Sequence, residues 1–185
     1  GGPYLGGNYW SDYTGIDTDG DGLGDTLLPY NSSGNILNGG DYLPLVKKPT
    51  APAVFDTGKG TYPSIMGTHE GIIIPSCNIN LSRLYTYPCS GTGGHTEHIR
   101  IYDESGTVAE GYWEGYQGDY HNITLTPPVT LLAGHTYNYT IITGSYPQIH
   151  HTNALLTSNG WINCTSFVDA NGKVYTDWIP AIKLY

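Results

Sequence analysis

Four aspartates separated by glycine, threonine and leucine carry the clearest chemistry in the chain: Asp17, Asp19, Asp21 and Asp25. The stretch follows the pattern D-x-D-x-D-G, in which carboxylates at loop positions 1, 3 and 5 bind Ca²⁺ and the glycine allows a sharp turn. Leu23 would add its backbone carbonyl and Asp25 a further oxygen, because Ca²⁺ takes about six to eight oxygen ligands. The spacing predicts a Ca²⁺ site formed by Asp17, Asp19, Asp21, Leu23 and Asp25.

The loop differs from that of a calcium-sensing EF-hand. An EF-hand ends in a bidentate Glu at loop position 12, where this chain has Leu28. Gly15 and Pro29 also argue against flanking helices, so we predict a permanently occupied site rather than a switch that opens helices. Asp12 or Asp41 would complete the ligand shell. The alternative is an acidic, glycine-rich linker that binds no ion.

Patterns typical of catalysis are scarce. The chain has no G-x-S-x-G motif, no phosphate-binding P-loop and no carboxylate pair whose roles follow from spacing. We therefore predict no catalytic residues and a protein that is not an enzyme.

The seven histidines do not form a local metal motif. On an extended strand His95 faces the side opposite to His98, and His150 and His151 also diverge. A metal site built across strands from His69, His95 and His121 is one alternative. Histidines that bond to backbone groups in loops and turns are the other.

Four aromatic residues are candidates for a site that binds sugars. Tyr112, Trp113, Tyr116 and Trp161 form a candidate sugar-stacking platform. They fit the core of a β-structure equally well, because Tyr and Trp are favoured in strands and bury large areas.

Composition indicates a secreted, β-rich protein. Lys and Arg number 7 against 16 Asp and Glu, and the formal net charge of −9 disfavours nucleic acid and anionic membranes as partners. The longest aliphatic run is Ile72-Ile73-Ile74, which is too short to span a membrane. Charged residues make up only 12% of the chain, whereas Tyr numbers 17 and Gly 26, a balance that favours strands and turns in an extracellular protein.

Two further features fit an extracellular location. N-x-Ser/Thr glycosylation motifs begin at Asn31, Asn80, Asn122, Asn138 and Asn163, and strand alternation places the middle three on the solvent face. The three cysteines allow three alternative disulfides, of which we prefer Cys89 with Cys164, because Cys89 follows a strand end and Cys164 points inward. Cys77 is then left for a cross-link to another chain or as a plain buried thiol.

The chain divides into two regions. Residues 1–52 form an arm that is rich in Gly, Asp and Tyr and ends in a Pro-bounded linker, Lys47–Pro52. The arm is too poor in aliphatic residues for its own core. Its larger apolar side chains must then pack on the following domain or on a neighbouring molecule: Tyr4, Tyr9, Trp10, Tyr13, Leu27, Leu28, Tyr42 and Leu45.

Residues 53–185 show short alternating segments between Gly, Pro and Asn turns. This pattern predicts an all-β fold, an antiparallel β-sandwich of jelly-roll type, with the calcium-loop arm extending from it. The expected strands lie at 71–74, 77–87, 98–103, 108–113, 120–125, 129–132, 136–143, 161–167, 174–178 and 181–184.

Both regions resemble known families. The stretch Gly7–Tyr13, continuing through Asp17–Asp25 to Asp41–Leu45, resembles the tail that closes right-handed β-helix repeats in NosD-like and other archaeal surface proteins, over residues 1–46. Residues 53–185 resemble an uncharacterised β-sandwich domain of secreted archaeal surface proteins, through motifs at 67–69, 84–89, 91–95, 115–122, 143–147 and 177–181. The resemblance implies an archaeal, extracellular setting and supports the pairing of Cys89 with Cys164.

These features lead to one expected function and one alternative. We expect a calcium-stabilised structural subunit of an archaeal extracellular assembly, such as a surface layer, sheath or filament, that polymerises with itself through the arm. The alternative is a carbohydrate-binding or adhesion module that binds cell-surface glycans. We expect no membrane span.

Overall fold

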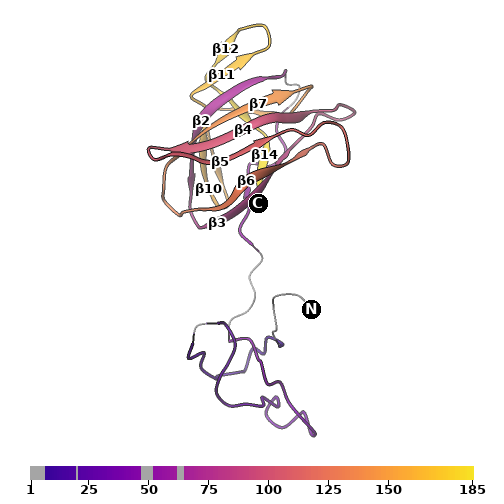
Figure 1. Ribbon diagram of the computed structural model, residues 1–185, viewed down its shortest axis with the longest axis vertical. Coiled ribbons are helices and arrows are strands. Elements are labelled where there is room, and N and C mark those ends of the chain that lie inside the picture. Colours follow the sequence, from indigo (N-terminus) through magenta and orange to yellow (C-terminus); the bar gives the residue numbers. More distant parts are fainter. Residues whose placement is uncertain (1–6, 20, 47–51, 62–64) are drawn as a thin grey trace. The chain divides into compact units, whose positions relative to one another are not determined.

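The structure, a computed structural model, describes residues 7–19, 21–46, 52–61 and 65–185 (Figure 1). Contacts divide the chain into two compact units, Gly1–Ala51 and Pro52–Tyr185. We call residues 7–46 the arm and residues 52–185 the body, and we describe each by itself. Tyr4 and residues 47–51 of the expected linker lie outside the described residues.

All regular elements of the described residues are β-strands, and every pair of them is antiparallel. The all-β prediction is therefore confirmed. No helix in the described ranges has the length and apolarity that a membrane crossing needs. The strands are β1 (Phe55–Asp56), β2 (Gly67–Pro75), β3 (Ile79–Thr86), β4 (His95–Asp103), β5 (Gly106–Tyr112), β6 (Asn122–Leu131), β7 (Tyr137–Gly144), β8 (Ile149–His151), β9 (Ala154–Thr157), β10 (Gly160–Asn163), β11 (Ser166–Asp169), β12 (Val174–Tyr175), β13 (Trp178–Pro180) and β14 (Ile182–Leu184).

The strands of the body form a nearly closed, barrel-like sheet. Its order is β1-β14-β3-β6-β5-β4-β7-β2-β10-β9, with β11 and β12 attached beside β2 and a separate pair formed by β8 and β13. The link between β5 and β6 is narrow, because only Glu110 and Thr126 are paired there. In Figure 1, β4, β5 and β6 cross the face turned toward the viewer.

The core lies inside this curved sheet. Alternate residues of the central strands point inward, so Ile99 and Ile101 on β4 and Tyr139 and Ile141 on β7 are fully buried. The cluster of buried apolar side chains contains residues of the body alone among those described. The body therefore has the hydrophobic core that the arm lacks.

Several strand boundaries differ from those expected. Residues 120–125 and 129–132 join in one strand, β6, although Pro127 and Pro128 lack N–H donors. The two prolines are accommodated because they lie where the β3–β6 pairing shifts register, between Leu81 and Arg83. The strands β8 and β9 were not expected, although Asn159-Gly160 is a typical hairpin signal and β9 pairs with β10 around it.

The arm contains only isolated β-bridges within its described residues, such as the one between Tyr30 and Asp41. Three of its aromatic rings pack on one another: Trp10 and Tyr13 both contact Tyr30, with ring centroids 5.4 and 5.2 Å apart. The expectation that these two side chains must pack outside the arm was therefore wrong. Other apolar side chains remain exposed, including Ile16, Leu27, Leu37 and Tyr42.

A histidine is buried in the body beside β11 and β13. The ring of His69 is fully buried and stacks on Phe167 at 4.2 Å between centroids. Its Nδ1 lies 3.1 Å from the carbonyl oxygen of Trp178, to which it donates, and its Nε2 has no hydrogen-bond partner within the described structure. Burial lowers the pKa of His69 from 6.5 to about 4. The folded state therefore keeps this imidazole neutral.

We predict that the free energy of unfolding decreases as the pH falls from 6.5 to 4. In this window the unfolded chain binds a proton at His69 that the folded chain does not, so stability is lost by up to about 3 kcal/mol. Urea unfolding at several pH values measures the slope. His69→Asn keeps a donor near the Nδ1 position but cannot titrate, so the slope should flatten. The exposed His151→Asn is the control, and His150, whose pKa burial also lowers, keeps part of the slope in every variant. A slope in His69→Asn as steep as that of the unmodified chain would contradict the assignment.

Candidate functional site

Backbone hydrogen bonds join the loop Asp17–Asp25, which we call the aspartate loop, to residues 44–46 at the end of the arm. Leu23 and Leu45 form an antiparallel bridge. On either side of it, Gly24 N donates to the carbonyl of Pro44 at 2.8 Å and Val46 N to the carbonyl of Gly22 at 3.2 Å. These bonds hold the C-terminal half of the loop in place without any hydrophobic core.

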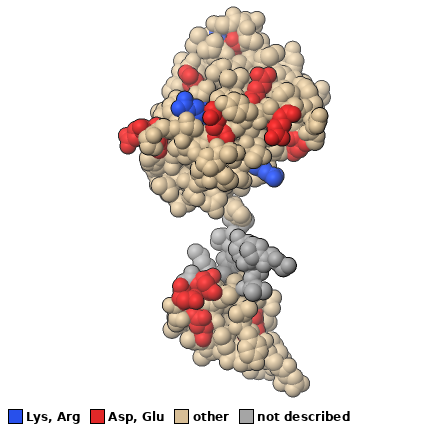
Figure 2. All heavy atoms as spheres, in the orientation of Figure 1, with Lys and Arg blue, Asp and Glu red and all other residues tan. Residues whose placement is uncertain are grey.

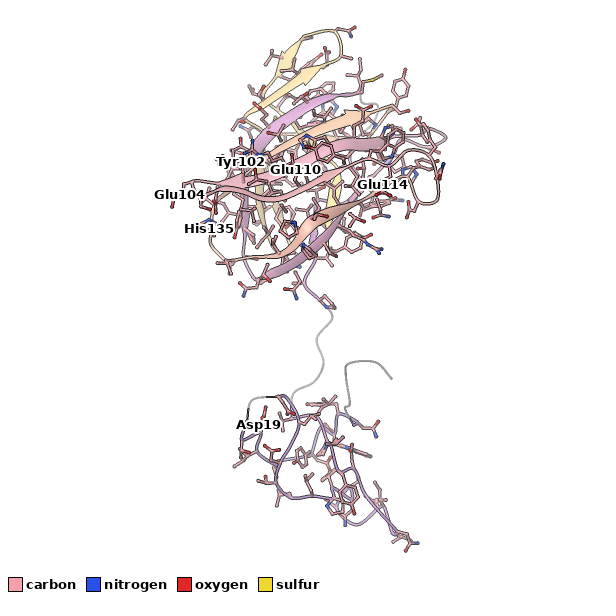
Figure 3. All side chains as sticks on the ribbon, in the orientation of Figure 1. Asp19, Tyr102, Glu104, Glu110, Glu114 and His135 are labelled. Atoms are coloured by element: carbon pink, nitrogen blue, oxygen red, sulfur yellow. The ribbon has the colours of Figure 1, made fainter. Side chains whose placement is uncertain are left out.

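Three of the predicted ligands converge. One carboxylate oxygen each of Asp17, Asp19 and Asp21 lies within 4.8 Å of the other two. Two oxygens that bind one Ca²⁺ at about 2.4 Å are at most twice that distance apart, so the group fits a single ion. Figure 2 shows acidic side chains of the arm gathered where Figure 3 labels Asp19.

Hydrogen bonds from the backbone orient the same three carboxylates. Gly22 N donates to Asp17 Oδ2 at 2.9 Å, and Leu23 N donates to Asp21 Oδ1 at 2.8 Å. Asp21 N also donates to Asp19 Oδ1 at 3.2 Å. A carboxylate oxygen can accept more than one interaction, and the charge of a bound ion would offset the repulsion between three neighbouring carboxylates.

Asp25 lies outside the group of three. Its Oδ2 accepts hydrogen bonds from the hydroxyl of Thr18 at 2.5 Å and from Thr18 N at 2.7 Å, and these bonds lower the pKa of Asp25. Its own N–H donates to the carbonyl of Ile16 at 2.9 Å. Asp25 therefore joins the two ends of the loop through Thr18 and Ile16, and Leu23 forms the bridge to Leu45.

Asp41, which we considered as a further ligand, holds the arm together. Its carboxylate accepts hydrogen bonds from Asn8 N at 2.8 Å, Trp10 Nε1 at 2.9 Å and Leu43 N at 3.0 Å. Burial raises the pKa of Asp41, but the three donors outweigh burial and lower it overall. Asp12, the other candidate, lies beside Tyr30 and raises the pKa of that phenol.

The histidines considered for a second metal site bond to backbone carbonyls. His95 Nδ1 lies 2.6 Å from the carbonyl of Gly93, and His121 Nδ1 lies 2.8 Å from that of Gly94. His69 bonds to Trp178 in the same way. Within the described ranges, Asp17, Asp19 and Asp21 form the one group of three or more metal-binding side chains, so His69, His95 and His121 do not assemble.

The four aromatic residues of the expected sugar platform occupy different environments. Trp113 stacks on His95 with centroids 3.7 Å apart and contacts Tyr116 edge to face at 4.7 Å. Tyr112 stacks instead on His98, and Trp161 lies on β10, paired with Ile74 and Leu156. Only Trp113 and Tyr116 are in mutual contact.

The three cysteines are free thiols, so the expected disulfide between Cys89 and Cys164 is not formed. Cys89 and Cys164 lie beside different segments of the chain. Cys89 N donates to the carbonyl of Tyr146, and Cys164 N donates to the carbonyl of Asn153. The Cys89 thiol donates to the carbonyl of Pro147 at 3.6 Å, and burial raises the pKa of Cys164. Cys164 does point inward, as the strand alternation predicted, and Cys77 is half-buried against the core.

The glycosylation motifs differ in exposure. The side chains of Asn31 and Asn80 are exposed, while those of Asn122, Asn138 and Asn163 are partly buried. The amide nitrogen of Asn122 donates to Asp119 Oδ2 at 2.6 Å, and Asn163 Oδ1 accepts from Ile72 N at 2.7 Å. Asn31 and Asn80 are therefore the most accessible acceptors for a glycan.

Searches among protein families, curated proteins and solved structures find no match to this chain. The resemblances to archaeal surface proteins therefore stay predictions. Among the described residues, Asp17, Asp19 and Asp21 form the most complete candidate site.

We predict that Asp19→Asn lowers the affinity for Ca²⁺ about tenfold or more, because it removes one of three negative ligands. Calorimetric titration of the whole chain with Ca²⁺ measures the effect. Glu104→Gln removes an exposed carboxylate of the body, labelled in Figure 3, and should leave the affinity unchanged. Equal affinities for the two variants would show that the loop is not the site.

We also predict that Asp41→Ala destabilises the arm by about 2 kcal/mol, because three N–H donors lose a charged acceptor. Hydrogen exchange at Asn8, Leu43 and the indole of Trp10, followed by NMR, reports on the arm separately from the body. Exchange at these three sites should accelerate. The exposed Asn38→Ala is the control within the arm, and unchanged protection in Asp41→Ala would contradict the role assigned to this carboxylate.

Proposed function

We propose that this chain is a calcium-stabilised structural subunit of an extracellular assembly, and that it joins neighbouring copies through its arm. The observation that carries the proposal is the combination, in one small unit, of a converging carboxylate group with large exposed apolar side chains. Leu37 is 87% exposed, and Ile16, Leu27 and Tyr42 are each more than half exposed. Apolar side chains exposed to this extent are typical of surfaces that another molecule covers.

Calcium has a physical role in such an assembly. The arm lacks a hydrophobic core, so its conformation depends on hydrogen bonds and on the loop of Asp17, Asp19 and Asp21. An ion bound there would neutralise the carboxylates and fix the loop against residues 44–46, which reduces the entropy lost when the arm docks. We therefore propose Ca²⁺ as a constant structural ligand.

We extend the proposal to the location of the protein and to the fold of the body. We place the protein outside the cell, in an archaeal surface layer, sheath or filament, on the strength of its composition, its glycosylation motifs and the family resemblance. We interpret the body as a jelly-roll-like β-sandwich. The single pair that joins β5 to β6, Glu110 with Thr126, supports this interpretation, because the two sheets of a sandwich share few strand pairings.

We predict calcium-dependent polymerisation of the purified chain. In millimolar Ca²⁺, negative-stain electron microscopy and sedimentation should show ordered polymers that dissolve in chelator. Asn in place of Asp17, Asp19 and Asp21 together should abolish them. A chain that binds Ca²⁺ tightly yet stays monomeric over all concentrations would refute assembly while leaving the metal site intact.

A matched pair of leucines tests the arm as the contact. Leu37→Ser should weaken polymerisation, because it removes an apolar side chain of the arm that is 87% exposed. Leu156→Ser changes a similarly exposed leucine, 79%, on β9 of the body and should have little effect. The opposite outcome would place the contact on the sheet edge of the body and contradict docking through the arm.

A further inference from the structure

A groove runs along the outer face of the body between β5 and β6. Glu110 and Tyr112 share this face of β5, because successive side chains of a strand point to opposite sides, and Glu114 lies two residues beyond the end of β5. Together with Thr124 and Thr126 of β6 they line a groove of about 440 Å³. Figure 3 shows Glu110 and Glu114 on the side of the body that faces the viewer.

The two strands that flank the groove are paired at one position. Beyond Glu110 and Thr126 the β5–β6 ladder does not continue among the described residues. The volume lies within the range of small-molecule sites, about 300–1,000 Å³.

Tyr112 is exposed, but contacts of its ring and of its hydroxyl fix the side chain. The residue is 65% exposed, but its ring stacks on His98 with centroids 4.5 Å apart and an interplanar angle of 24°. Its hydroxyl donates to Glu110 Oε1 at 2.9 Å. An exposed tyrosine normally loses side-chain entropy when a ligand binds it, and these two contacts have already removed much of that cost. Tyr112 is therefore a preorganised aromatic surface.

Glu110 offers an acceptor next to this surface. The same Oε1 accepts a second hydrogen bond from His98 Nε2 at 2.8 Å, while Oε2 has no hydrogen bond within the described residues. The bonds from His98 and then Tyr112 lower the pKa of Glu110, so it stays ionised and accepts only. Arg100, the cross-strand partner of Glu110, also lowers the pKa of Glu110 through its charge; it donates to Thr107 and lies over the ring of Tyr102.

We propose that this groove binds a neutral glycan. The apolar face of a pyranose ring would stack on Tyr112, while its hydroxyls donate to Glu110 Oε2 and Glu114 and exchange hydrogen bonds with Thr124 and Thr126. The two carboxylates that line the groove, Glu110 and Glu114, repel the negative charge of sialylated or sulfated glycans. This function concerns the body alone and does not depend on assembly through the arm.

The test uses the whole chain on an array of immobilised oligosaccharides that contains β-glucan, mannan, galactan and chitin fragments with sulfated and sialylated glycans. We expect binding to one or more neutral glycans, confirmed by calorimetry with the soluble oligosaccharide. Tyr112→Ala should weaken that binding more than tenfold, and Tyr112→Phe, which loses only the bond to Glu110, by a smaller factor. Glu110→Gln should also weaken it.

Tyr146→Ala is the matched control, because Tyr146 is also exposed, 52%, but lies outside the groove. It should bind like the unmodified chain, and circular dichroism checks that each variant is folded. Absence of any neutral glycan ligand, preference for acidic glycans, or unchanged binding in folded Tyr112→Ala overturns the proposal. Binding that disappears in 0.5 M NaCl would show that it depends on attraction between charges and would also overturn the proposal.

Discussion

The arm depends on the hydrogen bonds that the carboxylate of Asp41 accepts. This carboxylate accepts N–H donors from Asn8 and Trp10 on one side of the chain and from Leu43 on the other, and so joins two segments that are about thirty residues apart. The aromatic contacts of Trp10 and Tyr13 with Tyr30 add to this junction, but none of the described arm residues belongs to the buried apolar core. The bridge between Leu23 and Leu45 lies just beyond Leu43, so the aspartate loop is held in place by the same junction.

This construction explains why a metal ion suits the arm. A unit without a core gains little from hydrophobic burial, so each fixed charge or hydrogen bond matters more to its stability. Asp17, Asp19 and Asp21 bring three negative charges together, which raises the free energy of the folded loop unless a cation binds. Exposed apolar side chains such as Leu37 add a second opportunity for stabilisation, by contact with a neighbour.

The body follows different physics. Its strands curl into a nearly closed sheet around aliphatic and aromatic side chains. Glycine at position 111 allows β5 to approach β6 closely, because a Cβ on Gly111 would lie 2.6 Å from the carbonyl oxygen of Thr124. Because the interior provides the stability, the outer face of β5 is free to carry polar groups. Glu110 accepts hydrogen bonds from Tyr112 and from His98 of β4, and the three side chains form a fixed polar and aromatic surface.

Sequence alone determined the all-β class and the grouping of Asp17, Asp19 and Asp21, because strand alternation and loop spacing are local properties of the chain. It also placed Cys164 inward by the same alternation. Only the tertiary structure decided that Cys89 and Cys164 remain apart, that Asp41 binds N–H groups, and that Tyr112 meets His98 while Trp113 meets His95. These contacts depend on which distant strands become neighbours, and register between strands is set by packing of the whole sheet.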